Sequence, residues 1–124
     1  MTAVVSHIEL HLARERGHPQ GDPNHAYHLY LPLSDDGRID AKAWRDNQPL
    51  CHVRRQRPNE EEARGRIVHG PGGRWIFDYD DGSARDDEVG FRLNTERFVP
   101  GEYVSIREDD GKTHVFQVVS VRPS

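Results

Sequence analysis

The sequence lacks the features that form disulfides, span membranes or direct secretion. Cys51 is its single cysteine, so no intrachain disulfide can form. No apolar run approaches the roughly 18 residues that a membrane-spanning helix requires. The start of the chain, MTAVVSHIEL, lacks both the basic segment and the sustained apolar core of a secretory signal. These shortages exclude a disulfide scaffold and a helical membrane span, and they predict a cytoplasmic protein.

Lysine and net positive charge are also scarce. Lys42 and Lys112 are the only lysines among 17 basic residues, and the formal net charge is −4. A negative balance gives no general attraction to nucleic acid or to an anionic membrane. With 34% hydrophobic and 31% charged residues, the chain has enough apolar side chains for one lean core. We therefore expect residues 1–124 to form a single domain whose strands are buried on one face.

What the sequence does contain is alternation of apolar and polar side chains. Residues 102–107 and 113–121 alternate and flank Asp110-Gly111, which is a strong hairpin signal. Residues 4–12 and 27–33 alternate in the same way, as half-buried strands do. The pattern predicts an all-β fold, namely a small antiparallel β-barrel or highly curved sheet of six to eight strands with one short helix.

The remaining elements are predicted from turn and capping residues. Asp40 is a candidate helix N-cap before residues 41–47, and Pro49 ends that helix. Glycine and proline predict a loop over 17–25. Further predictions are strands at 51–57, 66–69, 74–78 and around 91–93, a tight turn at Gly72 and Gly73, and an acidic loop over 80–88.

Four side chains in the first quarter of the chain form a candidate metal site. His7, Glu9 and His11 alternate along one predicted strand, so they project from one face at about 6.6 Å per step. If the first two predicted strands pair, His28 lies on the same outward face. Imidazole and carboxylate groups at this spacing are ligands of Zn²⁺ and other first-row metals. The alternative is a solvated outer face, because half-exposed strands commonly alternate polar and apolar side chains.

Arginines gather in the middle of the chain, near a tryptophan. Arg55 and Arg57 point one way from their predicted strand and Arg54 points the other. Beside an exposed aromatic ring, such residues form a stacking platform with phosphate contacts, as small barrels use for single-stranded nucleic acid. The alternative is internal ion pairing with the glutamates at 60–62. The candidate ligand- or partner-binding residues are Arg54, Arg55, Arg57, Arg74 and Trp75.

The sequence carries no catalytic fingerprint. Cys51 and His52 are neighbours on a predicted strand and face opposite ways, so the imidazole cannot take the thiol proton. The serines and glycines match no nucleophile elbow, P-loop or dinucleotide motif. The acidic run from Asp78 departs from the EF-hand pattern. We expect Cys51 to be a small buried residue, and His69 and His114 to be structural.

Several blocks together are familiar. They are DGRIDAKAW at 36–44, CHVRR at 51–55, GRWIFDYD at 73–80, and the terminal FVPGEYVSI and HVFQVVSV. Over residues 25–122 the chain resembles a family of small uncharacterised proteins of alphaproteobacteria and their relatives, for which no activity is known. The resemblance implies a shared fold and a bacterial cytosolic setting, and it carries over no functional residue.

Taken together, the sequence favours a non-enzymatic module that binds another protein, a small ligand or a second copy of itself. Segregated charge, with arginine over 54–74 and acid over 78–88, favours such pairing. The alternative is a metal-dependent enzyme or metal-binding protein that uses the N-terminal histidine face. A third reading is a nucleic-acid-binding small barrel. The sequence identifies no cofactor and leaves enzymatic activity open.

Overall fold

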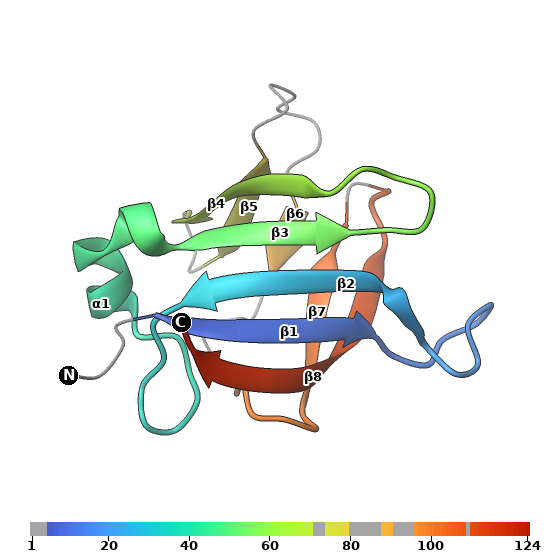
Figure 1. Cartoon of the computed structure of the whole chain (residues 1–124), viewed down its shortest axis with the longest axis horizontal. Coiled ribbons are helices and arrows are strands. Elements are labelled where there is room, and N and C mark those ends of the chain that lie inside the picture. The colour runs from blue at the N-terminus through green and yellow to red at the C-terminus, as the bar shows by residue number, and fades with distance from the viewer. Residues whose placement is uncertain (1–4, 71–73, 80–87, 91–95, 109) are drawn as a thin grey trace.

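The computed structural model describes residues 5–70, 74–79, 88–90, 96–108 and 110–124. Within these ranges the chain forms eight strands, one α-helix and one 3₁₀ turn (Figure 1). The strands are β1 (Ser6–Leu12), β2 (Asp22–Leu31), β3 (His52–Gln56), β4 (Ala63–His69), β5 (Trp75–Tyr79), β6 (Glu88–Gly90), β7 (Tyr103–Arg107) and β8 (Thr113–Pro123), and the helices are α1 (Ala41–Asp46) and the 3₁₀ turn Gln48–Leu50.

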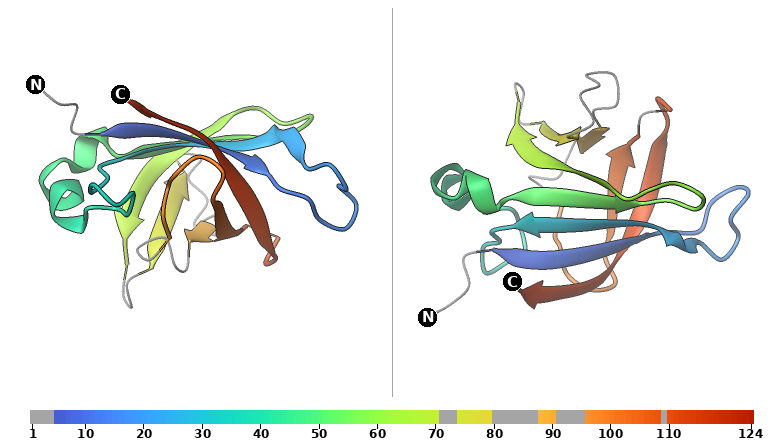
Figure 2. Two further views of the ribbon diagram at one scale, coloured as in Figure 1. Left: turned by 90° about the horizontal axis from the view of Figure 1, so that it is seen from below. Right: turned by 45° about the horizontal axis from the view of Figure 1, so that its top comes forward.

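The eight strands pair antiparallel in chain order, and β1 pairs with β8 to close a barrel (Figures 1 and 2). The contact between β6 and β7 is the shortest, with the single pair Val89 and Arg107. The predicted class is therefore confirmed: an all-β, strongly curved antiparallel barrel with one short helix.

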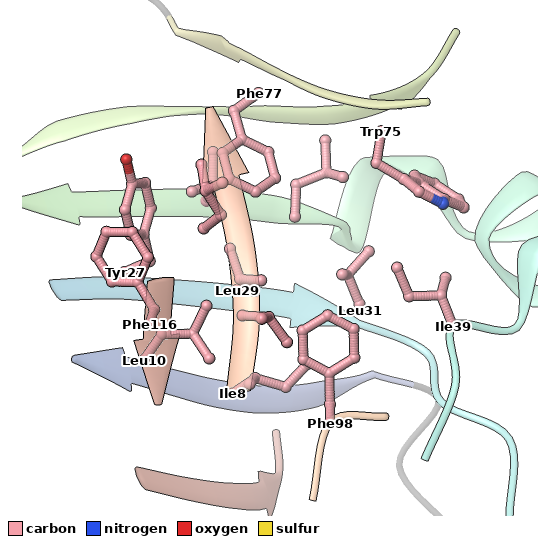
Figure 3. Packing of buried hydrophobic residues seen from close by; sticks show 14 of the residues in the cluster. Ile8, Leu10, Tyr27, Leu29, Leu31, Ile39, Trp75, Phe77, Phe98 and Phe116 are labelled. Carbon is pink, nitrogen blue, oxygen red and sulfur yellow. The ribbon is translucent and has the colours of Figure 1, made fainter. Parts of the chain in front are cut away.

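Alternation places the core inside the barrel. Ile8 and Leu10 on β1 lie opposite Leu29 and Tyr27 on β2, and all four are fully buried. Because strand side chains alternate between faces, the residues between them point outward. Figure 3 shows apolar side chains from several strands meeting in this interior. The largest fully buried side chains are Trp75, Tyr27, Phe77, Phe98 and Phe116.

The helix α1 lies at one end of the barrel (Figure 1). The Asp40 side chain accepts a hydrogen bond from the Ala43 N–H at 3.1 Å, which confirms the predicted N-cap. Trp44 is the buried residue of this helix; its indole N–H donates to the Ile67 carbonyl, and its ring meets Trp75 edge-on at 5.3 Å. No helix in the described ranges has both the length and the apolar character needed to cross a membrane.

Two predicted strand starts were wrong. β4 begins at Ala63, earlier than the strand predicted over 66–69. The loop predicted over 17–25 ends earlier, because β2 begins at Asp22 and pairs with Leu12 after a register shift in β1. Gly21 turns the chain into the strand with φ of +72°. Tertiary pairing with β1 thus overrides the local proline and asparagine preference. The predicted turn at Gly72 and Gly73, the acidic loop through residue 87 and the strand around 91–93 lie outside the described residues.

Candidate functional site

The outer histidine face, which comprises His7, Glu9, His11 and His28, is assembled as two contacting pairs. His7 Nε2 lies 2.8 Å from His28 Nδ1 on the neighbouring strand. His11 Nε2 lies 2.6 Å from Glu9 Oε2 on the same strand. The predicted pairing of the first two strands therefore does bring His28 beside the β1 residues. Within the described ranges, no group of three or more His, Cys, Asp or Glu residues is placed to hold a metal ion.

A ladder of stacked rings crosses the strands beside this face. His7 stacks on Tyr30 with ring centroids 4.6 Å apart and planes 12° apart. Tyr30 in turn stacks on His52 of β3, at 4.0 Å and 11°. Arg54 donates to the Tyr30 hydroxyl at 3.1 Å and lies 3.3 Å from a Glu62 oxygen. Three strands thus hold these rings in fixed orientations.

Electrostatics keeps the two contacting histidines neutral. Burial and the neighbouring His28 lower the pKa of His7, and Arg122 and Arg54 act in the same direction. Burial and Arg54 lower the pKa of His28, against the attraction of Glu9. Two neutral imidazoles share one proton between their facing nitrogens, so one nitrogen of the pair keeps a lone pair.

The predicted arginine and tryptophan set does not form one surface. Trp75 is completely buried, where a stacking platform would require it to be exposed. Arg55 points into the barrel with its guanidinium 4.6 Å above the Tyr79 ring, and Arg57 also points inward, to Glu108. Arg54 faces outward, and its ion pair with Glu62 matches the predicted internal pairing. Arg74 is exposed, but the geometric condition for nucleic-acid stacking is not met because Trp75 is buried.

The side chains predicted to be structural have defined partners. Cys51 is buried, and burial raises the pKa of its thiol to about 11, so it is a poor nucleophile. His69 stacks on Trp75 across the β4–β5 pair, with centroids 4.2 Å apart. His114 lies among the carboxylates of Glu15, Glu108 and Asp110.

One of these carboxylates, Glu108, lies at the centre of a buried polar cluster at the end of the barrel opposite α1. The carboxylate cluster comprises His25, Tyr27, Arg57, Glu108 and His114. Glu108 is only 4% exposed, and it accepts hydrogen bonds from the Tyr27 hydroxyl and from His25 Nε2 at 2.8 Å. The Arg57 guanidinium lies 3.2 Å from the same oxygen, and His114 Nε2 lies 3.5 Å from the other.

The cluster keeps Glu108 ionised inside the protein. Burial by itself raises the pKa of Glu108, but hydrogen bonds from His25 and Tyr27 and the charge of Arg57 outweigh burial and lower the pKa to about 2. A carboxylate with this many donors is a poor proton acceptor near neutral pH. Because the donors come from β2 and the segment after β3, Glu108 ties the β7–β8 turn to both.

His114 extends the cluster towards the surface. Its Nδ1 atom lies 3.0 Å from Glu15, in the β1–β2 connection, and its Nε2 atom lies 3.2 Å from Asp110. Burial opposes the charged ring, but the hydrogen bonds to Glu15 and Asp110 and the nearby Glu108 raise the pKa of His114. The His114 ring therefore links two loops at this end of the barrel.

An open groove runs over the outside of the barrel where β1, β7 and β8 meet. The outer groove has a volume of about 670 Å³ and is lined by Leu12, Ala13, Arg14, Gln20, Tyr103, Val115 and Gln117. Tyr103 is 57% exposed and Val115 is 40% exposed, which is unusual for large apolar side chains. Arg14 is its charged residue, and the two glutamines offer amide donors and acceptors.

Sequence reasoning missed both the carboxylate cluster and the outer groove. Strand alternation did carry a signal for the cluster. Val104 and Ile106 face the core, so Glu108, two residues further, continues the inward face. The same alternation runs from Val53 through Arg55 to Arg57. No sequence signal identifies the groove, because it joins residues from distant parts of the chain.

The comparisons with known proteins add no likeness to these observations. Protein-family models, curated proteins and solved structures give no match to this chain. Its function is therefore argued from its own side chains.

Proposed function

We propose that this protein is a non-enzymatic interaction module that binds an extended, acidic segment of a partner protein in the outer groove. The observation that carries the proposal is the exposure of Tyr103 and Val115 beside Arg14 in one hollow. Exposed tyrosine, next to arginine, is the composition that protein interfaces favour.

The size and lining of the groove fit a chain segment. A volume of about 670 Å³ accommodates several side chains, and the groove is open to solvent along the outside of the barrel. Tyr103 and Val115 supply apolar contacts, while Gln20 and Gln117 can pair with the backbone amides of an extended peptide. Such a segment satisfies both kinds of lining residue at once.

The charge of the groove favours an acidic segment. Arg14 is exposed and is the charged side chain of the lining, so a carboxylate on the partner gains a planar, two-pronged hydrogen-bonding site. The chain as a whole is acidic, with a net charge of −4, which makes the positive character of the groove local.

The test is a selection of random displayed peptides against the protein, followed by binding measurements on the enriched sequences. We expect enriched peptides to carry an acidic residue next to apolar ones. Tyr103→Ala should weaken their binding by roughly tenfold or more, and Arg14→Glu should weaken it further at low salt.

The chain offers a matched control on the same strand. Val115 and Val119 are both exposed valines on the outer face of β8, but Val115 lines the groove and Val119 does not. Val115→Ser should weaken peptide binding and Val119→Ser should not. Equal effects, or no enrichment over an unrelated protein, would contradict the proposal. Concentration-dependent dimerisation abolished by Tyr103→Ala would replace the peptide by a second copy of the chain.

A further inference from the structure

Two imidazole nitrogens from neighbouring strands meet on the outside of β1 and β2, away from the outer groove. His7 Nε2 and His28 Nδ1 are 2.8 Å apart, with ring centroids 5.0 Å apart and planes at 37°. We propose that His7 and His28 form a two-histidine site for a divalent transition metal ion that favours square-planar coordination, Cu²⁺ or Ni²⁺, with water in the remaining positions.

The two nitrogens are close enough together for one metal ion to bind both. Their 2.8 Å separation is a hydrogen-bond distance, and it is also close to the about 2.9 Å between nitrogens bound at about 2.0 Å and at right angles. In a tetrahedral site, which Zn²⁺ prefers, the nitrogens lie about 3.3 Å apart. Among the ions with right-angled ligands, copper(II) and nickel(II) favour nitrogen and oxygen ligands in a square plane, and they stand high in the affinity order of divalent metals.

Outer contacts orient the two rings. His28 makes a side-chain hydrogen bond with Gln56, which is the kind of outer contact that orients a metal-binding imidazole. On binding, the proton between the two facing nitrogens moves to the other nitrogen of the ring that carries it. Both rings remain neutral, and no proton leaves the protein.

The neighbouring rings hold His7 in place. Its ring stacks on Tyr30, and Tyr30 stacks on His52, so three strands restrict its orientation. Glu9 lies directly opposite His28 in the β1–β2 register and adds negative charge beside the pair. Arg54 and Arg122 act against a cation, although Arg54 is paired with Glu62.

This site is smaller than the four-residue site that the sequence predicts. His11 and Glu9 contact each other at 2.6 Å, so neither is directed at the His7–His28 pair. The inference therefore makes His7 and His28 ligands and leaves His11 outside the site. That division is what the experiment tests.

The experiment titrates tag-free, full-length protein with CuCl₂ alone in a weakly coordinating buffer and follows binding by calorimetry and electron paramagnetic resonance. We expect one bound ion with two nitrogen ligands. His7→Ala and His28→Ala should each weaken binding about tenfold or more, while His11→Ala and His18→Ala, on the same face and on an exposed loop, should leave it within about twofold.

A second variant separates ligand loss from structural damage. His7→Phe keeps an aromatic ring to stack on Tyr30 but has no nitrogen, so it should lose the metal while the far-ultraviolet circular dichroism stays that of the wild type. Unchanged copper affinity in the His7→Ala, His28→Ala double variant would overturn the proposal. Loss of copper binding in His11→Ala would also overturn it. An electron paramagnetic resonance spectrum that shows a single nitrogen ligand would do the same.

Discussion

At the scale of single residues, the buried carboxylate of Glu108 has four polar partners, namely Tyr27, His25, Arg57 and His114. Its Oε2 atom accepts hydrogen bonds from Tyr27 and His25 and forms an ion pair with Arg57, and the side chain is buried. Removing one partner from a buried ionic network leaves the others desolvated and uncompensated. The network therefore stabilises the fold only as a complete set, and its loss should be costly.

We predict that Glu108→Gln lowers the free energy of unfolding by about 3 kcal/mol, because it removes the charge that Arg57 and His25 face. Urea denaturation measures this change. Glu60→Gln is the matched control, since Glu60 is 51% exposed and lies 4.0 Å from the same arginine. That control should stay within about 0.5 kcal/mol of the wild type. Similar losses in both variants would contradict the role of the buried carboxylate.

The free energy of unfolding at acidic pH should also depend on Glu108. Its pKa falls from an ordinary 4.5 to about 2 in the folded protein, so the folded state favours the carboxylate. This contribution is present above pH 4.5 and is lost as the pH falls towards 2. The difference in unfolding free energy between wild type and Glu108→Gln should therefore shrink over that interval. A constant difference would show that the charge is not responsible.

His114 should affect the free energy of unfolding at higher pH, above its ordinary pKa of 6.5. Its folded pKa is raised from 6.5, so the stability it contributes is complete below pH 6.5 and is lost as the pH rises through the folded value. We expect the stability difference between wild type and His114→Gln to decrease above pH 6.5. Denaturation at a series of alkaline pH values measures it. A difference that grows with pH would refute the raised pKa.

At the scale of elements, β4 and β5 approach each other unusually closely at Gly65. A Cβ atom there would lie 2.7 Å from the Tyr79 Cα and still closer to the Asp78 carbonyl oxygen. Both atoms belong to backbone, which cannot rotate away as a side chain can. Glycine is thus the residue that lets these two strands pair and bring Tyr79 into the core.

We predict that Gly65→Ala destabilises the barrel by about 3 kcal/mol, because the new methyl group forces β4 and β5 apart. Gly70→Ala is the comparison. Its Cβ would meet the Ile76 Cδ1 atom at 2.8 Å, at the flexible end of a side chain, so a smaller loss is expected. Thermal and urea unfolding of the two variants give the ranking. A larger loss in Gly70→Ala would contradict the backbone argument.

At the scale of the whole molecule, aromatic and aliphatic side chains fill most of the described interior, and both tryptophans belong to it. Trp75 is 0% exposed and Trp44 is 9% exposed. We predict blue-shifted tryptophan emission with little quenching by iodide until the protein unfolds. Added oligothymidylate should leave the emission unchanged at low salt. Strong quenching by either agent would show an accessible ring and restore the nucleic-acid reading.

Much of this architecture could be predicted because strand alternation is a local property. The faces of β1, β7 and β8, the Asp40 cap and the position of His28 on the outer face beside β1 follow from alternation, capping chemistry and one assumed strand pairing. The start of β2 could not be predicted, because a register shift in β1 determines it. The outer groove was equally inaccessible, since it depends on how β1, β7 and β8 come together.

The pairing of β1 with β8 has a consequence for how the protein is made. β1 precedes the other described strands in the chain, and its partner Thr113–Pro123 is the last of the eight. One edge of β1 must therefore remain unpaired until β8 has been synthesised. Strand edges of this kind are where nascent chains associate wrongly, and contacts between distant segments form slowly. Refolding rate and yield should consequently be limited by the final closure between the first and last strands.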